Sequence, residues 1–203
     1  MNYNTIPSDE SIQKAADALK ANGIEAIIVQ NSEEAKAKVL ELIPEQSEVM
    51  TMTSETLRNT GITAAIDESG KFDSVRNKLN SLDREKDGRE MRKLGAGPDY
   101  TVGSVHAITE DGKLLIASNT GSQLPAYVYG AGTVIWVAGA QKITENIEAA
   151  RKRVYDYVLP LESERAHKAY GVEGSFVSKL LMIEREVNPT RAKIIIVKES
   201  LGF

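Results

Sequence analysis

Residues able to hold a small anion gather between Gly103 and Lys142, where apolar runs are separated by polar loops that contain glycine. One of these loops offers hydroxyl groups and closely spaced backbone amides at an expected helix start, a place where carboxylates and phosphates bind. Its candidate ligand-binding residues are Thr120, Gly121, Ser122 and Gln123. The alternative interpretation is structural, with Asn119 or Thr120 as a helix cap and Gly121 as a turn residue.

Two basic residues are further candidates for pairing with an anion. Lys142 follows the apolar run from 133 to 138, which is typical of a central strand covered on both faces. Ligands of open parallel sheets gather beyond the carboxyl ends of the strands, so we expect Lys142 to reach such a site. Arg165 is the second candidate, provided that the end of its element meets the central loops.

Glu110 and His106 are the candidate catalytic residues. Glu110 precedes Asp111-Gly112, and a carboxylate needs burial or a like-charged neighbour to gain a pKa suited to catalysis. The same three residues also form a hairpin turn, so a solvated, structural Glu110 is the alternative. A histidine in a half-buried strand can transfer protons, but it can equally be a hydrogen-bonded structural residue. The histidines lie far apart in the sequence without metal-ligand spacing, so no metal site is expected, and no cofactor is indicated.

Repeated strand-then-helix units are expected to position these residues. Ser8 begins a helix that ends at Gly23, an apolar strand follows at 25–30, and Asn31 caps the next helix. A strand at 47–53 and a short helix at 54–59 repeat the unit. Such alternation predicts an α/β fold with a layered, mostly parallel sheet.

The second half of the chain is expected to complete the sheet. Strands are predicted at 101–109, 113–118, 133–138, 180–183 and 194–197, the last closing an edge of the sheet. A helix is predicted over 143–157 with Arg151, Lys152 and Arg153 exposed. The charged stretch 72–94 is typical of a solvated helix or helix pair, with an interaction surface as the alternative.

Composition limits the classes of function. The 203 residues, 41% hydrophobic and 27% charged, predict one domain over 1–203. A net charge of -4 gives no long-range attraction for nucleic acid or anionic lipid. The absence of cysteine excludes a thiolate-bound iron–sulfur cluster in this chain, so a redox centre would belong to a partner. No signal peptide or membrane-spanning run is recognised, and a cytoplasmic location is expected.

Several segments together resemble the LUD domain family, named for lactate utilisation, in its lactate utilisation protein C type. They are SETLRNTGI, HAITEDGKLLI, TGSQLPAYVYGAGTVIWVAGAQKI, EAARKRV, LPLESERA and IIIVKESLGF, so the resemblance covers about 46–203. It implies a three-layer, Rossmann-like sandwich related to the sugar-phosphate isomerase and CoA-transferase group. It also implies a role in the oxidation of L-lactate to pyruvate beside iron–sulfur oxidoreductase subunits.

The chain departs from the best-known pattern of this family at its candidate site. His106 stands where that pattern has Asn, Ser118 and Asn119 stand where it has Asp-Gly, and Ser122-Gln123 replace Asn-Arg. The resemblance supplies no catalytic residues. Three hypotheses follow: a protein that binds a small anionic or phosphate-bearing metabolite in lactate utilisation, a non-catalytic assembly subunit of an oxidoreductase complex, or an enzyme that transfers acyl groups or CoA.

Overall fold

Six strands form the central sheet of the protein. The computed structural model describes residues 2–203. Along the sheet the strands follow the order β1 (Glu25–Val29), β10 (Ala192–Val197), β7 (Thr133–Gly139), β4 (Tyr100–Gly103), β2 (Glu48–Thr51) and β3 (Asp73–Ser74). Every neighbouring pair is parallel. The predicted α/β fold with a mostly parallel, Rossmann-like sheet is confirmed.

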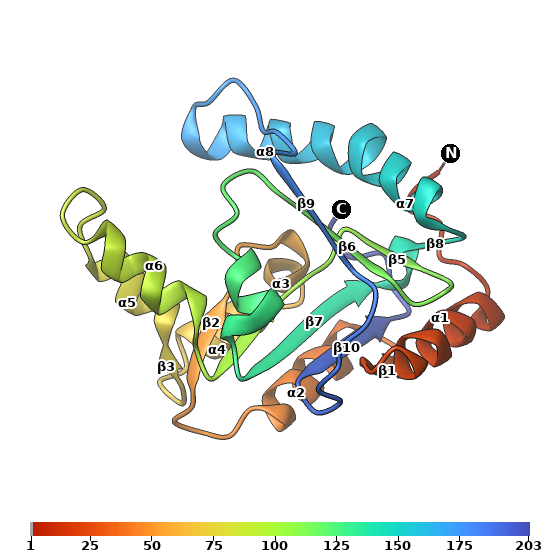
Figure 1. Cartoon of the computed structure of the whole chain (residues 1–203), viewed down its shortest axis with the longest axis horizontal. Coiled ribbons are helices and arrows are strands. Elements are labelled where there is room, and N and C mark those ends of the chain that lie inside the picture. The colour runs from red at the N-terminus through yellow and green to blue at the C-terminus, as the bar shows by residue number, and fades with distance from the viewer. Residues whose placement is uncertain (1) are drawn as a thin grey trace.

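Three helices cover one face of the central sheet (Figure 1). They are α2 (Ser32–Leu42), α3 (Glu55–Asn59) and α4 (Ile62–Asp67). Val39, Leu57 and Ile66 of these helices pack against Ile135 and Ile195 of the sheet, and all five are buried. Removing this apolar surface from water stabilises the helix-to-sheet contact.

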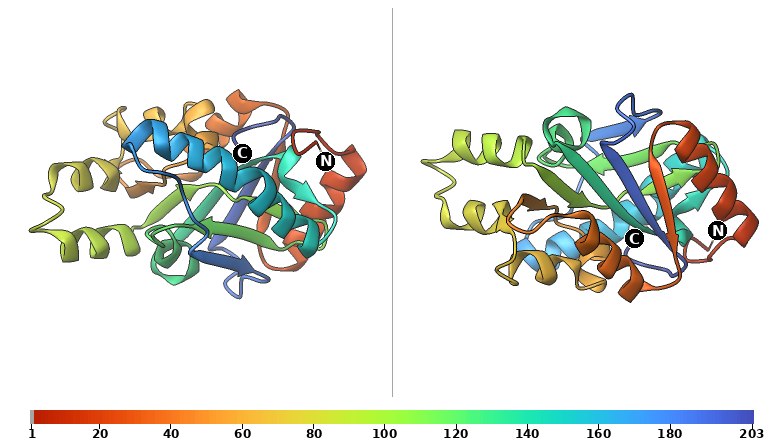
Figure 2. Two further views of the ribbon diagram at one scale, coloured as in Figure 1. Left: turned by 90° about the horizontal axis from the view of Figure 1, so that it is seen from above. Right: turned by 90° about the horizontal axis from the view of Figure 1, so that it is seen from below.

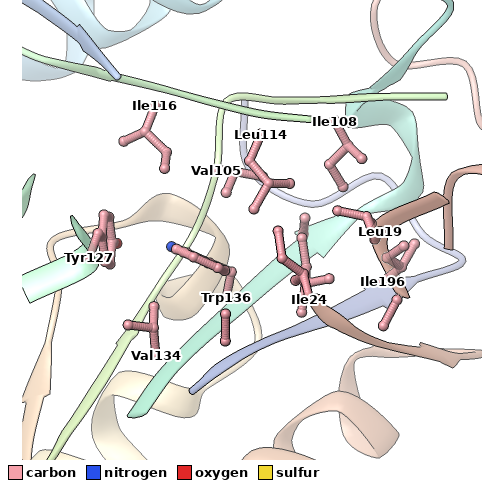
Figure 3. Packing of buried hydrophobic residues seen from close by; sticks show 14 of the residues in the cluster. Leu19, Ile24, Val105, Ile108, Leu114, Ile116, Tyr127, Val134, Trp136 and Ile196 are labelled. Carbon is pink, nitrogen blue, oxygen red and sulfur yellow. The ribbon is translucent and has the colours of Figure 1, made fainter. Parts of the chain in front are cut away.

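Helix α1 (Asp9–Ala21) and a second sheet cover the other face. Figure 3 shows Leu19 of α1 and Ile108, Leu114 and Ile116 of the second sheet in the same buried cluster as Trp136 of β7. Because side chains of β7 alternate between the two faces, both of which are covered, its sequence is continuously apolar. The result is three layers, with the central sheet in the middle.

The second sheet has four strands in the order β8 (Ile143–Thr144), β5 (Ala107–Thr109), β6 (Leu114–Ser118) and β9 (Lys179–Ile183). β5 and β6 are antiparallel and joined by the predicted Asp-Gly turn, in which Gly112 has a φ of 81°. The prediction of one strand over 101–109 was wrong, because the chain leaves the central sheet after Gly103 and enters the second sheet at Ala107.

A continuous helical segment from 147 to 170 covers the outer face of the second sheet. It consists of α7 (Ile147–Arg153), a π-helical turn η3 (Val154–Val158) and α8 (Leu159–Tyr170). The Asn146 side chain caps it by accepting a hydrogen bond from the backbone amide of Ala149. The predicted helix at 143–157 therefore begins later and continues further, and Arg153 is buried instead of exposed.

The charged stretch forms the predicted helix pair, α5 (Val75–Ser81) and α6 (Gly88–Ala96), which projects from the body of the molecule (Figure 2). Two short helical turns complete the structure, η1 (Ala126–Gly130) and η2 (Ala140–Lys142). Within residues 2–203, no helix has both the length and the apolar character needed to cross a membrane.

The last strand does not close an edge of the sheet, as the sequence had led us to expect. β10 lies between β1 and β7 and pairs with both. Its Ile194 and Ile196 face one hydrophobic core while Ile195 and Val197 face the other, which explains an apolar run without alternation.

Candidate functional site

A buried lysine lies at the carboxyl end of the central sheet. Lys142 ends the short turn that follows β7, and only 1% of its surface is exposed. Its ammonium nitrogen Nζ donates to Thr56 Oγ1 at 2.9 Å, to Ser104 Oγ at 3.1 Å and to the carbonyl of Val105 at 3.1 Å. All three N–H groups are used, yet none of the acceptors is a carboxylate.

The parallel topology brings these partners together. β4 and β7 are neighbours, so Ser104, directly after β4, lies beside the end of β7. Thr56 belongs to the first turn of α3, whose N-cap Ser54 accepts a hydrogen bond from the amide of Leu57. The ligand rule for open parallel sheets predicted the place of Lys142, but the sequence did not single out Thr56 as its partner.

The C-terminal segment covers this centre. Thr56 Oγ1 donates to the carbonyl of Leu201 at 3.2 Å, and Gln141 Nε2 donates to the same carbonyl at 2.9 Å. Gly202, with a φ of 61°, lies so close that a Cβ there would be 2.5 Å from Thr56 Oγ1. A side chain at position 202 would therefore collide with Thr56, one of the hydrogen-bond partners of Lys142.

Burial controls the charge of Lys142. Desolvation, together with the positive charge of nearby Arg153, lowers its pKa from 10.5 to about 7. Lys142 is therefore poised between its charged and neutral forms near neutral pH. A lysine of this kind can accept or release a proton, or gain its charge when an anion arrives.

Arg153, at the end of α7, is a second buried cation. It has no exposed surface, and its Nη1 donates to the carbonyl of His106 at 3.1 Å. Its Nε and Nη2 are buried without a hydrogen-bond partner among the described residues. Burial lowers the pKa of Arg153 to about 10, so the guanidinium remains charged at neutral pH. It lies 5.2 Å from the ring centre of Tyr157, a favourable cation–π distance.

A cavity of about 260 Å³ lies against Arg153. The N-terminal segment, the chain after β7 and helix α7 form its walls. It is lined by Asn2, Tyr3, Thr5, Gln141, Ile143, Thr144, Glu145, Ala149 and Arg153. Gln141 and Ile143, the sequence neighbours of Lys142, line this cavity, but the lysine itself does not.

His106 lies between these groups, just before β5. Its Nδ1 accepts a hydrogen bond from the amide of Ala117 at 3.1 Å, and its carbonyl binds Arg153. Burial, with the nearby positive charges of Lys142 and Arg153, lowers the pKa of His106 to about 3. The imidazole is therefore neutral at physiological pH, with its proton on Nε2.

Glu110 is engaged by helix α1. Its carboxylate accepts hydrogen bonds from Ser11 Oγ at 2.6 Å and from Lys14 Nζ at 2.7 Å. The hydrogen bond from Lys14, followed by that from Ser11, lowers the pKa of Glu110. In this arrangement Glu110 joins the β5–β6 hairpin to α1, and a catalytic role for it stays a prediction.

The predicted ligand loop is held mainly by its own hydrogen bonds. Ser118 Oγ accepts from the amide of Gly121 at 2.8 Å and donates to Gln123 Oε1, while Thr120 Oγ1 donates to Ser122 Oγ at 3.1 Å. Thr120 and Ser122 are exposed, and the loop does not line the cavity beside Arg153. Of the predicted ligand residues, Lys142 is the one that the structure places among buried charged groups.

Arg165 and His167 lie on α8. Arg165 forms a bidentate ion pair with Glu162, at 2.6 and 2.7 Å, and this pairing raises its pKa. His167 is exposed, and its Nδ1 lies 2.8 Å from the carbonyl of Val172. Neither residue lines the cavity beside Arg153.

A further cavity of about 210 Å³ lies beyond the end of β2. Arg58 and Arg76 both line it, but each has a partner. Arg76 Nε donates to the carbonyl of Thr51 at 3.2 Å, and Arg58 pairs with Glu55. The guanidinium groups that line this cavity therefore have more of their hydrogen-bonding capacity used than that of Arg153.

Sequence reasoning overlooked Arg153 because its neighbours Arg151 and Lys152 are solvent-exposed. The available signal was helical spacing, since Arg153 lies three residues after the buried Ala150 and four before Tyr157. The uncharged partners of Lys142 gave no comparable signal, because isolated threonine and serine residues occur throughout the sequence.

Comparison with known proteins identifies the family. A crystal structure of a DUF162 family protein from Deinococcus radiodurans, at 12% sequence identity, is similar to this chain with a TM-score of 0.57. The match covers 94% of this chain and 99% of that one, which supports the fold. Among curated proteins, none matches the sequence. The family model described as the LUD domain matches residues 12–197, so the chain belongs to the LUD domain family.

Proposed function

We propose that this LUD protein takes part in lactate utilisation by binding a small carboxylate-bearing metabolite at the carboxyl end of its central sheet. One observation carries this proposal: Lys142 and Arg153 are buried cations, and neither contacts a carboxylate among the described residues. An uncompensated buried charge is costly. An anion that enters this region gains interactions the protein itself does not supply.

The family's name supports the choice of metabolite. L-lactate and pyruvate each carry one carboxylate, and both are small enough for a cavity of about 260 Å³. The chain has no cysteine, so we assign electron transfer to iron–sulfur partner subunits and metabolite binding to this protein.

Isothermal titration calorimetry and thermal-shift measurements on the purified protein test the proposal. The ligands are L-lactate, pyruvate, inorganic phosphate and a CoA ester. A carboxylate at one hundred times its Kd should add about 2.7 kcal/mol of apparent stability. We expect Lys142→Met to weaken this binding, whereas the matched control Lys152→Met on the exposed face of α7 should not. Absence of carboxylate binding to the wild-type protein contradicts the proposal, and binding of the CoA ester alone favours the transferase hypothesis.

The loop predicted from the sequence requires its own control. Ser122 is exposed and bonds within its loop, so Ser122→Ala should leave the fold intact. We expect unchanged carboxylate affinity in this variant. A loss of affinity places the ligand at Thr120–Gln123 instead of beside Lys142.

A surface feature favours assembly as a second candidate function. β9 lies at the edge of the second sheet, with Met182 43% exposed, and Phe176, in the preceding segment, is 69% exposed. Unpaired strand edges and exposed apolar side chains are typical of protein interfaces. Copurification with a co-expressed iron–sulfur subunit, and its loss in Phe176→Ser, would support a subunit role, especially if no ligand binds.

A further inference from the structure

We propose that the cavity beside Arg153 is a carboxylate-recognition pocket, in which Nε and Nη2 of Arg153 bind the two oxygens of a monocarboxylate. This inference rests on the proposed function and specifies its ligand class and binding residue. Two adjacent N–H groups on one edge of a guanidinium match the spacing of carboxylate oxygens, and such bidentate pairs are strong and directional.

The unpaired state of Arg153 is the main support. Its third nitrogen, Nη1, is committed to the His106 carbonyl, which fixes the guanidinium in place. The ring of Tyr157 covers it at 5.2 Å and is itself stacked on Tyr3, with ring centres 5.2 Å apart. Arg153 is thus held in place with Nε and Nη2 unpaired within residues 2–203. Both nitrogens are covered by the surrounding chain, so a ligand in the cavity reaches them when this cover shifts. Groups of this kind are rare in native proteins unless a ligand or water satisfies them.

The lining of the cavity favours a monoanion over a phosphate dianion. Among residues 2–203, Arg153 is the one cationic residue that lines the cavity, and Glu145, which carries a carboxylate, lines it as well. A ligand with two negative charges would be attracted by Arg153 but repelled by Glu145, so this lining favours a ligand with a single negative charge. Ile143 and Ala149 supply apolar surface for a short carbon chain, while Thr5 and Asn2 offer polar groups for a hydroxyl or keto oxygen.

Calorimetry with L-lactate, pyruvate and methyl L-lactate tests the role of the carboxylate. We expect the two acids to bind and the uncharged ester to bind at least tenfold more weakly. Arg153→Lys keeps a positive charge but loses the bidentate edge, so it should weaken acid binding at least tenfold. Arg151→Lys, two residues earlier and exposed, is the matched control and should bind like the wild-type protein.

A second variant tests the pocket without changing Arg153, in case Arg153→Lys does not fold. Ala149 lines the cavity from α7 and is only partly buried, so Ala149→Leu should fill the cavity without disturbing Arg153. We expect it to lose acid binding while keeping the wild-type melting temperature within a few degrees.

The outcomes separate this inference from the proposed function. If the wild-type protein binds no carboxylate, both fail. If it binds L-lactate and neither Arg153→Lys nor Ala149→Leu changes the affinity, the function stands and the Arg153 pocket is wrong. Binding of inorganic phosphate in preference to L-lactate, with the same dependence on Arg153, overturns the monocarboxylate class.

Discussion

At the scale of single residues, the protein keeps positive charge away from water without a negative partner. The ammonium group of Lys142 donates hydrogen bonds to three neutral acceptors. The guanidinium of Arg153 donates to one carbonyl and lies over one aromatic ring. Neutral acceptors offset only part of the cost of desolvating an ammonium group, which is why the pKa of Lys142 falls to about 7.

This lowered pKa makes the free energy of unfolding depend on pH. Between pH 7 and 10.5 the unfolded chain holds a proton on Lys142 that the folded protein releases, so stability rises with pH across this window. The slope from this group approaches about 1.4 kcal/mol per pH unit. Urea denaturation at pH 7, 8 and 9 should show the rise in the wild-type protein and in Lys152→Met, and a flatter profile in Lys142→Met. Equal slopes in all three proteins would show that Lys142 keeps an ordinary pKa.

The sequence could indicate Lys142 but not Arg153, for a physical reason. Lys142 follows a run of apolar residues typical of a central strand, and in a parallel sheet this places it at the carboxyl edge where ligands bind. Burial of an arginine depends instead on which surface α7 packs against, and the second sheet that provides this surface is assembled from segments distant in the chain.

At the scale of elements, the β5–β6 hairpin is fastened to helix α1 at its turn. Glu110 bonds to Ser11 and Lys14, and Asn22 Nδ2 donates to the carbonyl of Gly112 at 3.1 Å. These contacts fix the hairpin against the layer that carries α1, and so help to position His106 at the start of β5.

We expect the Glu110–Lys14 pair to be structural and weak. Lys14 is 64% exposed and Glu110 21%, so solvent screens the interaction. Glu110→Gln and Lys14→Met should each lower the free energy of unfolding only slightly, and the double variant should lower it by less than their sum. L-lactate affinity should be unchanged in all three. A loss of binding in Glu110→Gln alone would support a role at the ligand site.

Local sequence patterns predicted the helices and turns better than they predicted the contacts between them. Asn31 and Ser54 cap the helices expected after them, and the Asp-Gly turn forms the expected hairpin. Pro160, in contrast, would normally end a helix because it lacks an N–H group. Here it follows the wider π-helical turn η3, and the helix continues to Tyr170. Such an adjustment depends on packing against the second sheet, which no local pattern records.

At the scale of the whole molecule, stability centres on the strands that serve both hydrophobic cores. β10 contributes Ile194 and Ile196 to one core and Ile195 and Val197 to the other, and all four are fully buried. The edge strand β9 contributes much less, since its Met182 is 43% exposed. The fold class was predictable from alternating elements, but the interior place of β10 was not, because strand order is decided by contacts between distant segments.

This difference gives a direct prediction. Ile195→Ala should lower the free energy of unfolding by about 2–5 kcal/mol, because it leaves a cavity between β10 and the helices. Met182→Ala, at the exposed edge, should lower it by less than about 1 kcal/mol. Urea denaturation of both variants measures the difference. Similar losses would show that the two sheets contribute equally to stability.

The interior position of β10 also governs how the chain can fold during its synthesis. β1, made early, pairs within the central sheet only with β10, which emerges from the ribosome some 160 residues later. Until β10 is made, β1 has no strand to pair with. β7, β4 and β2 can already pair with one another. We therefore expect the nascent protein to expose an unpaired strand during most of its translation, and to gain most from chaperone protection at its N-terminal end.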